Sequence, residues 1–405
     1  MLPPDGVPFA RLFLGPSVKE VTIPIASAHA ESSVELLSSV IPDLSPDIFR
    51  LNISSITGIS GPCSSIFRLI LGLHNLRFLN VDLKHRGLHE RVTARLGSLP
   101  ALCSLKMSLI QANQLHFYTT ALGQFPCLTE FSFAVDDWVS AAAIMDSMDC
   151  RFTDLAVTTH KEGSLSDLRT FTESMSRHPS LTSVTHLSLT DFETTLSDAD
   201  EAYIENVFRP LFGFADLKYV NLQFDVSAKL RNSWYADAAA AWRSLETIFV
   251  GSPNMGPLKA KATLAGLIPL VKHCTKLESV KLRIDAQPFD PSQIEVSNTI
   301  IQKLCLETYI IPSPREVFLS LIRMFPNLEC VCQSSRFSGS VSWPWDDVND
   351  MLHSSAVRRR GPCLTPKHGC TCHMTDSQGG PLKTRPQTPG SMLLRATTAS
   401  LRTRS

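Results

Sequence analysis

The sequence has no apolar run long enough to cross a membrane. Its longest apolar stretch, Ile66–Leu73, is interrupted by Arg68, whereas a membrane-spanning helix needs roughly 20 consecutive apolar residues. At the start of the chain, Pro3, Pro4 and Asp5 stand where a secretory signal would carry basic residues followed by an uninterrupted apolar segment. We therefore expect neither a membrane anchor nor secretion.

The sequence also lacks the short motifs that mark common catalytic sites. It contains no G-x-S-x-G nucleophile turn, no G-x-x-x-x-G-K-[ST] phosphate loop and no G-x-G-x-x-G dinucleotide turn. The pair His89-Glu90 begins like a zinc-binding H-E-x-x-H helix, but the second histidine is missing. Acidic pairs such as Asp136-Asp137 are typical of helix starts, where carboxylates favour the helix dipole. We expect no enzymatic activity and no cofactor.

Net charge is absent from the chain as a whole but not from its parts. Residues 351–405 contain nine Lys and Arg against one acidic residue, so the rest of the chain is acidic although the formal net charge is zero. Binding along a nucleic acid requires clustered basic residues over the contact face. An acidic body disfavours nucleic acid as a partner and favours a protein.

The eleven cysteines do not form a disulfide framework. Their number is odd, and several, including Cys103, Cys150 and Cys274, fall within or beside apolar runs, where a thiol behaves as a small apolar side chain. This pattern is typical of a reducing compartment. We expect an intracellular protein, either cytoplasmic or nuclear.

The sequence does contain a repeat. Its clearest copy, between Leu73 and Leu83, has the pattern L-x-x-L-x-x-L-x-V-x-L, which is a variant of the leucine-rich repeat. Other copies carry their L-x-L pair at Leu105, Phe131, Leu187, Val220, Ile248 and Val280, with weaker copies at Val21, Leu51, Leu155, Leu304 and Val331. Successive copies are roughly 24 to 33 residues apart. The repeats predict one domain over residues 1–340.

Each copy predicts a strand followed by a helix. The L-x-L segment alternates apolar and polar residues, as a strand with one buried face does, and helical spacing follows it, for example over 165–177, 237–245 and 315–325. A doubly wound sheet is the alternative, but its strands would be apolar on both faces. We expect an α/β leucine-rich-repeat-like solenoid, a horseshoe with a parallel sheet on the concave face and helices on the convex face.

The residues between and beside the leucines form the predicted contact surface. They alternate with the buried positions and therefore point to the concave side of the sheet. The partner-binding residues that we expect are Tyr219, Asn221, Gln223, Phe249, Lys281 and Arg283. Aromatic and arginine side chains are frequent at binding hot spots, and the two cations could suit an acidic or phosphorylated segment. For any single residue, a solvated strand face is the simpler interpretation.

The C-terminal part differs from the repeats. Trp343-Pro344-Trp345 lies in a segment, 341–355, that we expect to cap the open end of the array, and residues 356–405 are rich in Arg, Pro, Ser, Thr and Gly and predict a disordered basic tail. The tail contains five possible metal ligands, Cys363, His368, Cys370, Cys372 and His373. Structural zinc sites usually join two ligand pairs separated by a small domain, so we predict no metal site.

Phrases within the repeats resemble one family. Phe325-Pro326-Asn327-Leu328-Glu329 and the segment His273–Val280 resemble the repeat region of fungal F-box/leucine-rich-repeat proteins over about residues 10–340. The resemblance implies a substrate-recognition domain of a ubiquitin ligase, in which an F-box binds a Skp-type adaptor. The chain opens almost directly into a repeat and shows no F-box, so a Skp-type adaptor is expected only if an F-box exists upstream. The alternative is a repeat-only interaction protein with no ubiquitin role.

Overall fold

The structure is a computed structural model of the 405-residue chain. It describes residues 14–25, 30–55, 64–82, 96–97, 99–110, 125–161, 163–191, 201–251, 259–308, 310–332 and 345–360. The described residues form two compact units. The N-terminal unit contains strands β1 to β5 with helices α2 and α3, and the C-terminal unit contains β7 to β12 with α7 to α12; α6 and β6 lie where the two units meet in the sequence.

The strands form one open sheet whose order follows the sequence from β1 to β12. The strands of the N-terminal unit are β1 (Glu20–Ile25), β2 (Arg50–Ser55), β3 (Phe78–Asp82), β4 (Ser104–Ile110) and β5 (Glu130–Val135). Those that follow are β6 (Asp154–Thr159), β7 (His186–Asp191), β8 (Tyr219–Gln223), β9 (Thr247–Gly251), β10 (Ser279–Arg283), β11 (Lys303–Glu307) and β12 (Cys330–Cys332). The strand pairings are parallel. Each L-x-L copy of the sequence therefore contributes one strand.

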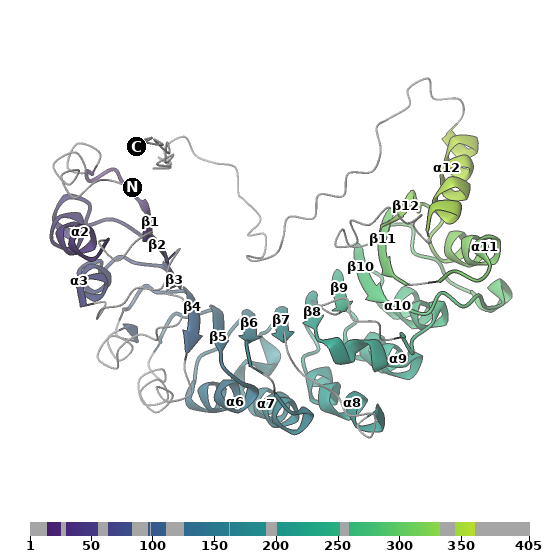
Figure 1. Ribbon diagram of the computed structural model, residues 1–405, viewed down its shortest axis with the longest axis horizontal. Coiled ribbons are helices and arrows are strands. Elements are labelled where there is room, and N and C mark those ends of the chain that lie inside the picture. The colour runs from purple at the N-terminus through teal and green to yellow at the C-terminus, as the bar shows by residue number, and fades with distance from the viewer. Residues whose placement is uncertain are drawn as a thin grey trace, which may run out of the picture. The chain divides into compact units, whose positions relative to one another are not determined.

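Helices connect the strands and, in each unit, lie along one face of the sheet (Figure 1). They are α2 (Ala30–Leu44), α3 (Ser64–Gly72), α6 (Trp138–Ser147), α7 (Leu165–Arg177), α8 (Glu201–Phe208), α9 (Asn232–Ala241), α10 (Leu267–His273), α11 (Pro314–Met324) and α12 (Asp346–Arg360). The helix expected over 165–177 has those bounds. The one expected over 237–245 begins earlier, at Asn232, and ends at Ala241, because Trp242 leaves the helical conformation (φ −103°, ψ 59°) to pack in the core.

The leucine positions of the repeat form the core. Their side chains point to the helix-covered face and are at most a few per cent exposed. In the N-terminal unit these strand residues are Leu51, Ile53, Leu79, Val81, Leu105, Met107, Phe131 and Phe133, and in the C-terminal unit they are Leu187, Leu189, Val220, Leu222, Ile248, Val250, Val280, Leu282, Leu304 and Leu306. Burial of each such side chain contributes about 1.5–3 kcal/mol.

A shared carbonyl fixes the offset between neighbouring strands. The Arg77 carbonyl accepts hydrogen bonds from the N–H groups of both Cys103 and Ser104, each at 2.9 Å. The same pattern recurs at the Lys218 carbonyl, which accepts from Glu246 (2.8 Å) and Thr247 (2.9 Å). Because the pattern recurs at the start of most described strands, leucine positions of successive repeats stay aligned although loop lengths differ.

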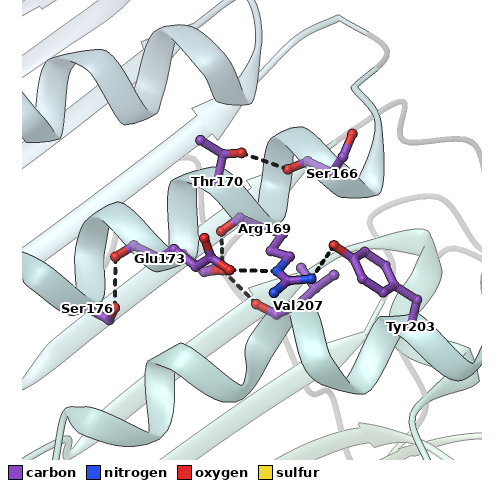
Figure 2. Close-up of polar contacts among 8 residues, drawn as sticks. Ser166, Arg169, Thr170, Glu173, Ser176, Tyr203 and Val207 are labelled. Carbon is purple, nitrogen blue, oxygen red and sulfur yellow. Dashed lines mark hydrogen bonds and ion pairs between the residues drawn. The ribbon is translucent and has the colours of Figure 1, made fainter.

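Helices α7 and α8 are joined by one buried and one exposed set of contacts (Figure 2). A capping box between Ser164 and Asp167 begins α7. Within the core, the Thr172 hydroxyl donates to the Val207 carbonyl at 2.6 Å. On the surface, Arg169 donates to Glu173 at 2.6 Å and to the Tyr203 hydroxyl at 2.9 Å. The tyrosine and the glutamate together raise the pKa of Arg169, which keeps its charge in this arrangement.

Aromatic rings fill the space between sheet and helices in the C-terminal unit. The Trp234 ring lies 5.8 Å from Trp242, 5.2 Å from Tyr235 and 6.3 Å from Phe208, all edge to face. Phe208 in turn contacts Phe224 at 5.2 Å. Edge-to-face pairs contribute about 0.5–1.5 kcal/mol beyond their burial. The Trp242 indole N–H is also satisfied, since it donates to the Leu211 carbonyl at 3.3 Å.

Helix α12 covers the last strand. The Asn349 side chain accepts a hydrogen bond from the Val331 N–H at 2.8 Å and donates to its carbonyl at 3.0 Å, so one amide takes the place of a further strand. Trp345 is buried and donates to the Leu306 carbonyl at 2.9 Å. An unpaired edge strand invites association with other chains, and α12 blocks that edge. The helix continues past residue 355, where we expected the tail to begin, as far as Arg360; residues 361–405 lie outside the described part.

No helix in the described ranges is both long enough and apolar enough to span a bilayer.

Candidate partner-binding surface

The six residues expected at the binding surface lie on three adjacent strands of the C-terminal unit. Tyr219, Asn221 and Gln223 belong to β8, Phe249 to β9, and Lys281 and Arg283 to β10. Asn221, Phe249 and Lys281 are register neighbours across the three strands. Their side chains alternate with the core residues and share the face opposite the helices. We call these six residues the C-terminal wall.

The centre of the wall is a cation held over an aromatic ring. The Lys281 ammonium lies 4.1 Å from the centroid of the Phe249 ring and 3.7 Å from Glu307 Oε1 on the next strand. The side chains of Lys281 and Glu307 are only 15% and 3% exposed. The lysine charge is therefore balanced by a residue of the neighbouring strand, which the sequence pattern alone did not reveal. The only signal was that Glu307 occupies, in the following repeat, the position that Arg283 occupies on β10.

A row of amides lies beside that ring. Asn221 is 6% exposed and donates from Nδ2 to the Ser188 hydroxyl at 2.9 Å, while Gln223 Nε2 donates to Asn221 Oδ1 at 3.2 Å. The chain Gln223–Asn221–Ser188 orders these side chains across two strands. Gln223 is the half-buried end of this chain and retains polar atoms that a partner can contact.

Tyr219 begins the wall at the start of β8. Its ring stacks on that of His186, with centroids 6.0 Å apart and planes at 27°. The side chain is half-buried, and loss of hydration raises the pKa of its hydroxyl. The hydroxyl therefore stays protonated at neutral pH and can both donate and accept a hydrogen bond.

Arg283 differs from what the sequence predicted for a contact residue. It is 3% exposed, like its register partner Glu307 on β11. A side chain so deeply buried has little surface to offer a partner. Gly251 is the register partner of Gln223, and a methyl group added there would sit 3.8 Å from Glu307 Oε2 and from a carbon of the Phe249 ring. The wall thus presents Tyr219, Gln223, Phe249 and Lys281, and Gly251 is buried among them.

The N-terminal unit has a wall of different chemistry. The Arg50 guanidinium lies 4.4 Å from the centroid of the Phe78 ring and 3.6 Å from Glu20 Oε1. Asn52 and Asn80 are register partners beside them. Their side-chain oxygens are buried and have no hydrogen-bond partner within the described ranges. Both walls therefore hold a cation over a phenylalanine ring, and the C-terminal wall differs in its second aromatic side chain, Tyr219, and in its hydrogen-bonded amides.

Metal sites with three or more ligands are absent from the part of the chain that the structure describes. The Cys363–His373 cluster lies outside it. Seven described cysteines are thiols. Burial raises the pKa of both Cys150 and Cys274 to about 11, which makes these thiols unreactive rather than nucleophilic.

The sheet is open, parallel and twelve-stranded, with one helix-covered face and one strand per L-x-L repeat. This architecture defines an α/β protein of leucine-rich-repeat type. No protein-family model and no curated protein matches the sequence. The fold is similar to the crystal structure of the Rad7 and Elc1 complex in yeast, with 12% identity, a TM-score of 0.48, and coverage of 83% of this chain and 82% of that one. It is also similar to the leucine-rich-repeat-containing protein LegL7 from Legionella pneumophila, with 13% identity, a TM-score of 0.39, and coverage of 81% and 92%.

Proposed function

We propose that this chain is a non-catalytic protein-binding scaffold and that the C-terminal wall holds its partner. The observation that carries the proposal is the placement of Tyr219 and Phe249, two half-buried aromatic side chains, on a sheet face that the helices of the unit leave uncovered (Figure 1). Aromatic side chains provide large contact areas at a small entropic cost, and they are frequent at binding hot spots.

The charges of the wall define the kind of partner. Lys281 is paired with Glu307, and Arg283 is buried, so the surface offers a partner rings, amides and one hydroxyl rather than net positive charge. We therefore infer that the partner is an extended protein segment with apolar side chains and backbone amides that are free to form hydrogen bonds. An acidic or phosphorylated segment fits this surface less well than the sequence suggested.

Affinity capture tests the proposal. The full chain and a Tyr219→Ala/Phe249→Ala variant are used to capture proteins from a native intracellular extract, with circular dichroism to verify folding. The matched control is Leu319→Ala, which truncates an exposed apolar residue on helix α11. We expect a partner that the chain and the control retain and the wall variant loses. Equal capture by all three would place the contact elsewhere.

Within this function, we propose a substrate-recognition role of the kind found in F-box ubiquitin-ligase receptors, inside the cell. The support is the resemblance of the repeats to that family. A pull-down with a purified Skp-type adaptor tests it, using the full gene product with any upstream exon. Adaptor binding would support the ligase role, and its absence would favour a repeat-only interaction protein.

A further inference from the structure

A buried carboxylate lies beside the cations of the C-terminal wall. Glu307 belongs to β11 and is 3% exposed. Its Oε1 atom lies 3.7 Å from the Lys281 ammonium on β10, and its Oε2 atom lies 3.8 Å from the point where a side chain at Gly251 on β9 would begin. The Glu307 side chain therefore extends from its own strand across β10 towards β9.

Two cations of β10 lie next to this carboxylate. Lys281 and Arg283 flank the core residue Leu282 and share the open face of the sheet, and Arg283 is the register partner of Glu307. The two basic side chains are only 15% and 3% exposed. Charges with so little exposure are weakly screened by salt, so the negative charge of Glu307 offsets much of the positive potential that they would otherwise produce at the wall.

The strand itself does not require a charge at this position. The core side of β11 needs only its apolar residues, Leu304 and Leu306. On β8, the corresponding last position of the strand holds Gln223, which has the same shape as glutamate but no charge. Because removing a carboxylate from water is costly, the charge of Glu307 calls for an explanation beyond the fold.

We propose that Glu307 is a specificity-determining residue of the C-terminal wall and that it excludes acidic and phosphorylated segments. The inference rests on the proposed binding function of that wall. Lys281 is held over the Phe249 ring at 4.1 Å with its charge already balanced. A partner's carboxylate or phosphate would lose hydration there without gaining a counter-charge, and it would meet the negative charge of Glu307. Segments with uncharged side chains avoid that cost.

Two labelled peptides test the proposal on the full chain. They share their leucines and serines and differ only in carrying glutamate or glutamine at the remaining positions. Fluorescence anisotropy at neutral pH and low salt compares the parent with Glu307→Gln. We expect the variant to bind the glutamate peptide about tenfold more tightly than the parent does, with a much smaller change for the glutamine peptide. The gain should disappear in about 0.5 M salt, which shortens the range of the attraction.

Glu278→Gln is the matched control. Glu278 is an exposed glutamate directly before β10, so its replacement changes the net charge equally without touching the wall, and it should give no gain. Glu307→Gln/Lys281→Met should lose the gain, because Lys281 is the cation that the single variant releases. If Glu307→Gln does not fold, Glu307→Gln/Arg283→Met takes its place, since it leaves one uncompensated cation instead of two.

The outcomes separate this inference from the function on which it rests. Equal binding of the glutamate peptide by the parent and Glu307→Gln, an equal gain in Glu278→Gln, or a gain that persists without Lys281 would overturn the role of Glu307. Failure of the binding function is a different result, because it appears as identical protein capture by the parent and by Tyr219→Ala/Phe249→Ala.

Discussion

The two units share the same strand pattern, but different types of side chain fill the space between their strands and helices. In the N-terminal unit, helices α2 and α3 contribute aliphatic residues such as Ile41, Leu69 and Ile70 to the core. In the C-terminal unit the corresponding space holds a continuous set of aromatic rings around Trp234 and Trp242. The open faces differ less: each holds a cation over a phenylalanine ring, but the buried asparagine oxygens of the first have no hydrogen-bond partner within the described ranges, whereas the amides of the second are hydrogen-bonded. A repeat constrains its strand positions, so differences accumulate in the helices and on the open face.

The largest effect should come from the aromatic core. Trp242→Ala removes a fully buried ring and should lower the free energy of unfolding by about 3–5 kcal/mol. Leu76→Ala, in the aliphatic core, should cost about 2–5 kcal/mol. Hydrogen exchange would measure both, with faster exchange expected mainly in β8 and β9 for the tryptophan and in β2 and β3 for the leucine. Identical exchange patterns would contradict the distinction between the two cores.

Cysteine reactivity should separate buried from exposed positions by orders of magnitude. A rise of pKa from 9.0 to about 11 at Cys150 and Cys274 lowers the thiolate fraction about 100-fold at pH 8. Mass spectrometry after brief alkylation should find Cys127, which is exposed, modified first. Because folding raises these two pKa values, their contribution to stability is present below pH 9 and is lost as the pH rises towards 11. Rapid labelling of Cys274 in the folded chain would contradict its burial.

The cap at the sheet edge should have an intermediate effect. Asn349→Ala leaves the Val331 N–H and carbonyl without their side-chain partners, at a cost of about 1–3 kcal/mol. Thermal unfolding and hydrogen exchange at Val331 would detect it. The neighbouring exposed Asp350 provides the control, and Asp350→Ala should change neither measurement. Equal behaviour of the two variants would show that α12 does not protect the edge.

The smallest effects distinguish the two contacts between α7 and α8 (Figure 2). Thr172→Val removes the buried hydrogen bond to the Val207 carbonyl and should cost about 1 kcal/mol. Arg169→Met removes the exposed contacts with Glu173 and Tyr203 and should leave the melting temperature unchanged, since solvent screens such pairs. A larger loss for Arg169→Met would reverse this ranking.

The strands could be predicted from the sequence because their constraint is local. A strand with one buried face requires an apolar residue at every second position. Leu79, Val81, Val220 and Leu222 meet that requirement, and they do so although the connecting loops differ in length. The start of α9 was harder to locate, because the alanine-rich segment before Trp242 gives little periodicity. The sequence predicted a cap over residues 341–355, but it did not predict how α12 pairs with the edge, since the contact of Asn349 with Val331 depends on tertiary structure.

The wall residues were placed on the correct face for the same local reason, but their exposure was not predictable. Because side chains alternate between the two faces of a strand, the sequence assigns Phe249, Lys281 and Arg283 to one side of the sheet. Whether each contacts solvent depends on the neighbouring strand, whose Glu307 neutralises Lys281. The burial of Arg283 likewise depends on side-chain packing that no single repeat encodes.

The most direct test of the account is photo-crosslinking from defined positions. A photoreactive phenylalanine analogue would replace Phe249 on the C-terminal wall, Phe78 on the N-terminal wall, or Leu319 on helix α11, in the full chain inside cells. The account predicts one discrete crosslinked protein from position 249 and none from the other two. Crosslinking from position 78 or 319, with none from position 249, would contradict the assignment of the binding surface to the C-terminal wall.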